Sequence, residues 1–292
     1  MNISPLVLSG VFAFGLMVGS FLNVCIWRIP AEEQVVKGRS HCRRCAKEIA
    51  WYDNIPLLSF LLLRGRCRHC KAKISWSYPF VELITGILFA ATVMHFGWSK
   101  VTAVYLILGA SLIVLSMIDF KEMILPDEIT LPGISLGVIL SFYAPELHGS
   151  FTRWGGLWAG VTGALVGSGL LWIIGVIGTW LFQREAMGFG DVKLMAMVGA
   201  MIGVWKVLLV DLILAPVLGS VVGIIMILTR ILSHGKDDYP PVRPRFKLFG
   251  LEGKSWTFPP IPFGPFLALG TIIAIFWGDG IIGWYRNLLV GG

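Results

Sequence analysis

The acidic residues of this chain offer the first chemistry, because one of them has an unusual setting. Asp191 ends the segment Gly-Phe-Gly-Asp at 188–191 and precedes Lys193 and a long apolar run. A carboxylate at the point where a loop enters hydrocarbon is costly unless it faces protein or water, so such a residue is a candidate functional group. Gly188 and Gly190 carry no side chain, which lets backbone or a bound peptide approach closely.

A second acid, Asp119, ends another apolar run and could act together with Asp191. Two carboxylates that share a site do not both ionise easily, so one is charged and the other neutral. The charged group can take a proton from water while the neutral group protonates or polarises a scissile carbonyl, as in aspartic proteases. A transporter could use the same pair to carry protons or a cation, so spacing alone leaves both functions open. Asp127 and Glu128 are second candidates, although acids after a proline at a helix start are also favoured by the helix dipole.

Two Cys-x-x-Cys motifs form a candidate metal site. They lie in a short internal repeat, 41–49 and 66–74, and 21 residues separate them. Four thiolates in this arrangement are typical of a zinc ribbon, whose closed tetrahedral site is structural and not catalytic. We therefore predict one structural zinc ion, bound by Cys42, Cys45, Cys67 and Cys70.

The four cysteines and the two neighbouring histidines also permit alternatives to this zinc site. The cysteines could form two disulfides, but reducing conditions in the cytoplasm disfavour them. His41 and His69 lie beside the thiols and could replace a ligand, although they are more simply solvated neighbours. A segment of about 45 residues has too little core to fold unaided, so metal binding would supply much of its folding free energy.

The elements that must position these residues are predicted to be membrane-spanning helices. The chain has 292 residues, of which 56% are hydrophobic and 14% charged, and its mean hydropathy is +0.78. This composition excludes an ordinary soluble domain and predicts an all-α polytopic membrane protein. We expect about eight transmembrane helices of bilayer-spanning length, at residues 5–27, 79–96, 101–119, 129–146, 155–182, 194–210, 212–232 and 260–278.

The Lys and Arg residues predict the orientation of these helices. One side of the membrane receives 28–78, 120–128, 183–193 and 230–258, which hold all 24 basic residues except Lys100, Arg153, Lys206 and Arg286. By the positive-inside rule this side is cytoplasmic, so both termini face outward and both candidate acids lie at the cytoplasmic boundary. Topology and contact with anionic membrane lipid explain the net charge of +7, which therefore indicates no nucleic acid partner.

Three polar residues within apolar stretches have more than one interpretation. Asn23 needs a hydrogen-bond partner on another helix, which either helix packing or a ligand pocket would provide. Glu82 could cap the first turn of its helix or belong to a polar pocket. We expect Asp211 at the outer boundary between two spans, as an interfacial helix-start residue.

The ordered set of motifs resembles the prepilin peptidase family, the type IV leader peptidases of the GxGD aspartyl class. Asp119 with the Leu-Pro-Asp segment at 125–127, and Gly188-x-Gly190-Asp191-x-Lys193, look like the family signature. The resemblance extends over nearly the whole chain, because 19–24, the paired cysteine motifs, 78–82 and 261–266 follow in the family's order.

This resemblance implies a bacterial inner-membrane endopeptidase with periplasmic termini. It would remove the short basic leader from prepilins or pseudopilins, cutting after a Gly at the cytoplasmic face with Asp119 and Asp191 as its catalytic pair. Members with the cysteine module usually also methylate the new N-terminal residue, commonly Phe, from S-adenosylmethionine. For the methyl-donor pocket the sequence offers only Asn23, Glu82 and the cysteine module.

We therefore predict three parts in the chain. Residues 1–28 form the first transmembrane helix, 29–78 a cytoplasmic zinc-ribbon-like module associated with methyl transfer, and 79–292 a seven-helix membrane aspartyl peptidase domain. The 233–259 loop is expected to be a partly ordered cytoplasmic connection, longer than is usual in the family. The residues expected to support the active site are Gly188, Gly190, Lys193 and Asp127.

Overall fold

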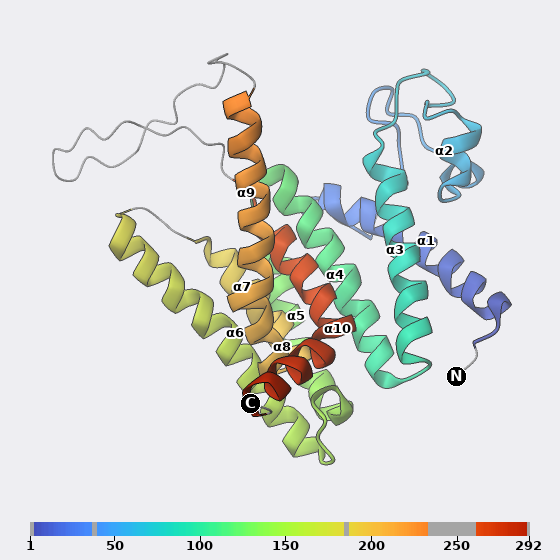
Figure 1. Cartoon of the computed structure of the whole chain (residues 1–292). Helices are drawn as coiled ribbons and strands as arrows, with labels where there is room; N and C mark the ends of the chain where they lie inside the picture. Colours follow the sequence, from blue (N-terminus) through green and yellow to red (C-terminus); the bar gives the residue numbers. More distant parts are fainter. Residues whose placement is uncertain (1–2, 37–39, 184–186, 233–260, 291–292) are drawn as a thin grey trace.

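The computed structural model of the chain describes residues 3–36, 40–183, 187–232 and 261–290 (Figure 1). These residues form helices and connecting turns, with two isolated β-bridges in the cysteine module. The predicted 233–259 loop lies outside the described residues. The long helices are α1 (Pro5–Arg28), α3 (Ser77–Phe96), α4 (Lys100–Glu122), α5 (Asp127–Tyr143), α6 (Arg153–Phe182), α7 (Phe189–Ile202), α9 (Ala215–Leu232) and α10 (Gly264–Val290). The short ones are η1 (Trp51–Asn54), α2 (Leu58–Leu62), η2 (Pro145–His148), α8 (Val204–Leu209) and the π-helical η3 (Val210–Leu214).

The predicted all-α membrane architecture is confirmed. Within the described residues, six helical segments are long and apolar enough to cross a membrane: Pro5–Arg28, Ser77–Phe96, Lys100–Glu122, Arg153–Leu181, Val204–Met226 and Gly264–Leu288. The two remaining predicted spans correspond to α5 and α7, which have 17 and 14 residues. Both are shorter than the usual span, and they pack against α6 and against each other.

The predicted boundary between the sixth and seventh spans is wrong. The sequence suggested a break near Asp211, but the chain breaks at Gly203, whose φ of +81° favours glycine. From Val204 the helical segments α8, η3 and α9 follow without interruption. Asp211 therefore lies inside a span, 2% exposed, and is not an interfacial helix start. Hydropathy missed the break because the residues on both sides of Gly203 are apolar.

The centre of the bundle is α7, in which every residue from Leu194 to Ile202 is buried. Glycines bring its neighbours close. A Cβ on Gly163 of α6 would collide with the backbone of Gly199, and one on Gly137 of α5 would lie 2.8 Å from the Ala200 Cβ. Small residues permit such close helix packing in lipid. Because α7 is fixed on two sides, the residues of its first turn have a defined position.

A second group of helices, α1 and α3, packs on the side of α4 (Figure 1). A Cβ on Gly19 of α1 would lie 2.7 Å from the Glu82 Cα, so these two helices touch through backbone. Buried apolar side chains from α1, α3 and α4 form one cluster that includes Leu22, Val81 and Ile118. The chain between α1 and α3 folds into the cysteine module, at the end of the molecule where α4 also ends (Figure 1).

Candidate active site

Two acids from different helices meet at one end of the bundle. Asp119 lies in the last turn of α4 and Asp191 is the third residue of α7. Their side chains are 6% and 8% exposed, and their carboxylates are close enough to interact electrostatically. The fold thus brings together two acids that are 72 residues apart in the sequence.

The first residue of α10 contributes a backbone donor to this pair. The N–H of Gly264 donates a hydrogen bond to Oδ2 of Asp119 over 2.9 Å. A backbone N–H at this position stabilises the ionised form of the carboxylate. A Cβ on Gly264 would lie 2.7 Å from the same oxygen, so only glycine fits without displacing the carboxylate or the backbone. The sequence included Gly264 in a matching segment but assigned it no role, because a backbone contact between distant segments leaves no side-chain signal.

The segment that connects α4 to α5 packs against the start of α7. Met123 ends α4 in the left-handed conformation, with φ 55° and ψ 37°, and its N–H donates to the Asp119 carbonyl over 2.9 Å. Two residues later, Leu125 meets Gly190, where a Cβ would lie 2.9 Å from the Leu125 Cβ. Gly190 therefore allows the two acid-bearing segments to approach each other. The sequence predicted that Gly190 permits close approach, but it did not identify Leu125 as the neighbour.

Gly188 is the N-cap of α7 and has an extended backbone, with φ −71° and ψ 139°. The Asp191 carboxylate folds back and hydrogen-bonds with the backbone of Gly188. An acid three residues after the N-cap that reaches back to the cap backbone forms one half of a capping box, because Gly188 has no side chain to return the bond. This bond holds the Asp191 side chain at the start of the helix.

An ion pair ties α7 to α5 beside the two acids. Lys193 Nζ donates to both carboxylate oxygens of Asp127, over 2.6 and 2.8 Å. Asp127 and Glu128 lie in the exposed first turn of α5, so the second candidate acids stand outside the buried pair. The four residues predicted to support the site therefore have different contacts near the start of α7. Gly188 caps the helix, Gly190 packs against Leu125, and Lys193 pairs with Asp127.

The four cysteines of the two motifs form one cluster. Their sulfur atoms lie within 4.8 Å of one another, and the Cys42 and Cys70 sulfurs are 3.7 Å apart. Zinc–sulfur bonds of about 2.3 Å in a tetrahedron place the sulfurs about 3.8 Å apart, so the geometry fits zinc. Backbone N–H groups of Cys45 and Arg44 lower the pKa of the Cys42 thiol to about 6, which favours a thiolate at this position. The pKa of the Cys70 thiol is raised instead, despite a backbone hydrogen bond from Ala72, by burial and by hydrogen bonds with the other three sulfurs.

The two motifs, which repeat in sequence, have the same backbone structure. In each, the first cysteine donates its N–H to a carbonyl five residues later, Lys47 in one motif and Ala72 in the other, over 2.9 Å. Ala46 and Lys71 occupy the same place in the two turns, with φ of 54° and 59°. All five cysteines of the chain are described and carry free thiols, so the disulfide alternative is wrong.

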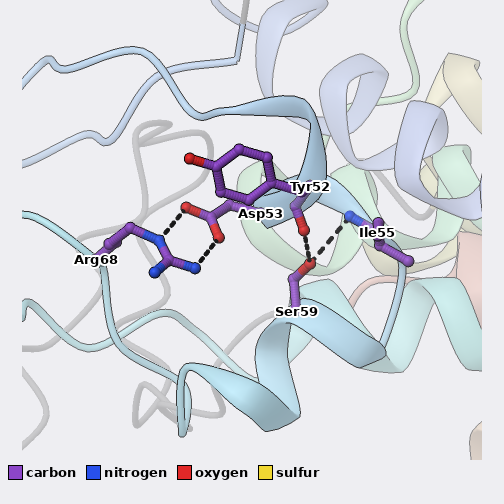
Figure 2. A network of polar contacts seen from close by, with 5 residues as sticks. All are labelled: Tyr52, Asp53, Ile55, Ser59 and Arg68. Carbon is purple, nitrogen blue, oxygen red and sulfur yellow. Dashed lines mark hydrogen bonds and ion pairs between the residues drawn. The ribbon is translucent and has the colours of Figure 1, made fainter.

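A polar network joins the second motif to the segment between the motifs (Figure 2). The Arg68 guanidinium donates to both oxygens of Asp53, over 2.6 and 2.7 Å. This interaction holds the pKa of Asp53 below its usual range. The Ser59 hydroxyl donates to the Tyr52 carbonyl over 2.9 Å and accepts the N–H of Ile55 over 3.0 Å. These contacts give the module internal structure in addition to any bound metal.

Asn23 and Glu82, the candidates for a methyl-donor pocket, lie where the module meets the membrane helices. The Asn23 amide donates to the Gly19 carbonyl over 3.3 Å and to the Tyr78 carbonyl over 3.1 Å. Oε2 of Glu82 accepts the N–H of Leu57 over 2.8 Å. Both side chains thus have partners within the junction of α1, α3 and the module.

A stack of charged and aromatic groups also joins the module to α4. The Arg43 guanidinium lies 3.2 Å from the ring centroid of Trp27, and Lys121 Nζ lies 3.8 Å from the same centroid. Trp27 in turn stacks on Tyr78 with the ring planes 18° apart. Cation–π contacts of this kind are favourable at a partly desolvated site. Lys121 follows Asp119 by two residues, so the module contacts the helix that carries one of the paired acids.

The fold and the site define a helical membrane protein with two buried acids from different helices and a cluster of four cysteines in the module between α1 and α3. Residues 106–226, which contain both acids, match the profile described as the type IV leader peptidase family. Residues 13–96, which contain the four cysteines, match the bacterial peptidase A24 N-terminal domain.

Known proteins are similar to this chain over most of its length. A protein of Aeromonas hydrophila named prepilin leader peptidase/N-methyltransferase is 38% identical over 305 residues, which cover 94% of this chain and 92% of that protein. One of the same name from Pseudomonas aeruginosa is 35% identical over 296 residues, or 91% and 89% of the two chains. Another, from Myxococcus xanthus, is 44% identical over 224 residues, or 77% and 64%. The chain therefore belongs to the type IV leader peptidase family. No solved structure matches it.

Proposed function

We propose that this protein removes the basic leader peptide from prepilins or pseudopilins, cutting after a Gly with Asp119 and Asp191 as the catalytic pair. The observation that carries the proposal is the meeting of these two buried carboxylates at the ends of α4 and α7. The named activity of the relatives supports the substrate class. Family membership also favours peptidase action over the transporter alternative.

We further propose that the acids face the cytoplasm from the inner membrane. The basic residues support this orientation, because the sequence segments predicted on the side of the acids and the cysteine module hold all of them except Lys100, Arg153, Lys206 and Arg286. The five free thiols are typical of a reducing compartment. With an even number of spans, both termini would then be periplasmic.

In the proposed mechanism, the ionised carboxylate takes a proton from a water molecule as the water oxygen attacks the scissile carbonyl carbon. The neutral carboxyl gives its proton to the carbonyl oxygen, which yields a tetrahedral diol. When the C–N bond breaks, the first carboxyl protonates the leaving amine and the diol returns a proton to the second. The Gly264 N–H favours Asp119 as the group that is ionised at the start.

A second activity, N-methylation of the new terminus, is supported by the names of the relatives and by the N-terminal domain match. The proposed donor is S-adenosylmethionine, whose methyl group passes from sulfur to the amine nitrogen as the amine loses a proton. The junction that contains Asn23 and Glu82 is the proposed site, and zinc bound by the four cysteines would hold the module in place. Mass spectrometry of a processed pilin should find one added methyl group only when the donor is supplied. An unmodified product would restrict the enzyme to cleavage.

Asp119→Asn and Asp191→Asn test the proposed peptidase site. Each purified variant should fail to cleave a prepilin, scored by its mobility shift, because an amide can neither take nor give the required proton. Asp279→Asn is the matched control, since that acid is exposed and forms an ion pair with Lys206 at 2.9 Å. Its cleavage rate should stay close to that of the wild type. Full cleavage by either active-site variant would disprove the pair, and a wild-type protein without cleavage would favour the transporter.

A further inference from the structure

An apolar groove lies between α6 and the start of α7, where its lining residue Val192 directly follows Asp191 in the sequence. Its volume is about 380 Å³. One wall is formed by residues of α6 between Leu171 and Trp180, and the other by Met187, Phe189 and Val192. Thr179 is the single polar side chain among the described lining residues. The second wall therefore belongs to the segment that carries Asp191.

The groove has a direction relative to the membrane. Trp180 lies near the end of α6 on the side of the acids and is 75% exposed, while Leu171 is 1% exposed and belongs to the main core. Nine residues of helix separate them, which corresponds to about 14 Å. The groove therefore runs from the end of α6 that precedes α7 toward the middle of that helix. Its length suits about four residues of extended peptide.

We propose that this groove binds the apolar residues that directly follow the scissile bond of the substrate. The inference rests on the proposed function. A basic leader cannot enter hydrocarbon without a large cost, so it must lie on the cytoplasmic side of Asp191. The retained part of the substrate then continues in the opposite direction, into a groove whose lining is apolar and aromatic. Large apolar side chains after the cleavage point would gain the most from burial there.

Gly175 offers a way to fill the groove. A Cβ at this lining position would lie 3.5 Å from the Met187 Cβ, an ordinary contact, so α6 accepts a side chain there. Gly175→Phe should raise KM at least about tenfold for a substrate with Phe after the scissile bond. With Ala in that position the increase should be less than about threefold, because little of the substrate then enters the groove. Gly169→Phe is the matched control on the same helix, since nothing lies within 4 Å of its Cβ.

Photo-crosslinking tests occupancy without requiring cleavage. A benzophenone amino acid placed at Val176, which lines the groove, should crosslink to the prepilin residues just after the cleavage point. The same group at Ile177, which is exposed outside the groove, should crosslink to lipid or detergent. Crosslinks from Val176 to lipid alone, or a Gly175→Phe enzyme with the wild-type KM for both substrates, would overturn the proposal. If the wild type cleaves no prepilin, the proposed function fails instead, and the crosslinks still report whether the peptide enters the groove.

Discussion

Gly264→Ala tests whether catalysis depends on the position of the Asp119 carboxylate, because it leaves that residue itself unchanged. The added Cβ would lie 2.7 Å from Oδ2 and 3.2 Å from Cγ of Asp119, both closer than ordinary van der Waals contact. Either the carboxylate or the start of α10 must move, so the 2.9 Å hydrogen bond from the Gly264 N–H is broken or distorted. Both aspartates remain present, and only their arrangement changes.

The expected loss follows from the strength of that bond. Hydrogen bonds to charged groups contribute about 1.5–3 kcal/mol. If the bond holds the ionised carboxylate in its reactive position, its loss should lower kcat about 10- to 150-fold, because each 1.36 kcal/mol corresponds to tenfold in rate. KM should change little, since Gly264 acts through Asp119 and not on the substrate.

Steady-state cleavage of a prepilin by purified enzyme measures both constants. Gly280→Ala is the matched control, because it makes the same substitution in α10 at a position where nothing lies within 4 Å of the new Cβ. This control should keep the wild-type kcat. A Gly264→Ala enzyme with kcat within twofold of wild type, or an equal loss in both variants, would refute the positioning role.

Two further predictions concern the metal centre and the ion pair. Metal analysis of the purified wild type should find one zinc per chain. Changing Cys42 and Cys45 together to Ser should remove the zinc, because the two remaining thiolates cannot complete the site. A wild type without zinc would contradict the assignment. Lys193→Met should lower the cleavage rate less than tenfold, since its partner Asp127 is half exposed and such pairs contribute about 1 kcal/mol or less. Adding Asp127→Ala to this variant should lower the cleavage rate little further, because the ion pair is already broken. Additive losses of rate in the double variant would show that the two residues do not act together.

Hydropathy and charge in the sequence were enough to predict the membrane helices and to suggest that Asp119 and Asp191 share an end of the bundle. Apolar run lengths report spans directly, and chain direction alternates from one span to the next. The cysteine cluster could also be predicted from the sequence, because the spacing and the repeat of its motifs are local features. These predictions succeeded where the structural information lies within a short stretch of chain.

Contacts between segments that are distant in the sequence could not be predicted from local patterns. The N–H that Gly264 offers Asp119 comes from backbone, which every residue except proline possesses, so no residue type marks it. The close approach of Gly190 to Leu125 likewise depends on how α4 ends. Asp211 was misplaced because an uninterrupted apolar run hides the break at Gly203. Its two carboxylate oxygens are buried and have no hydrogen-bond partner among the described residues, which is unusual for an interfacial residue.

The stack on Trp27 connects the two parts of the proposed function. Arg43 belongs to the first cysteine motif, whereas Lys121 follows Asp119 on α4, and both cations lie on the same indole. A zinc site needs all four thiolates, so bound zinc would keep the cysteine module folded. The folded module holds Arg43 against the membrane helices, and zinc binding would therefore fix the distance between the module and the paired acids. Under the proposed function, the amine released at those acids then emerges at the end of the bundle where the module lies. The new terminus could reach a methyl donor there while the apolar part of the product stays in the membrane.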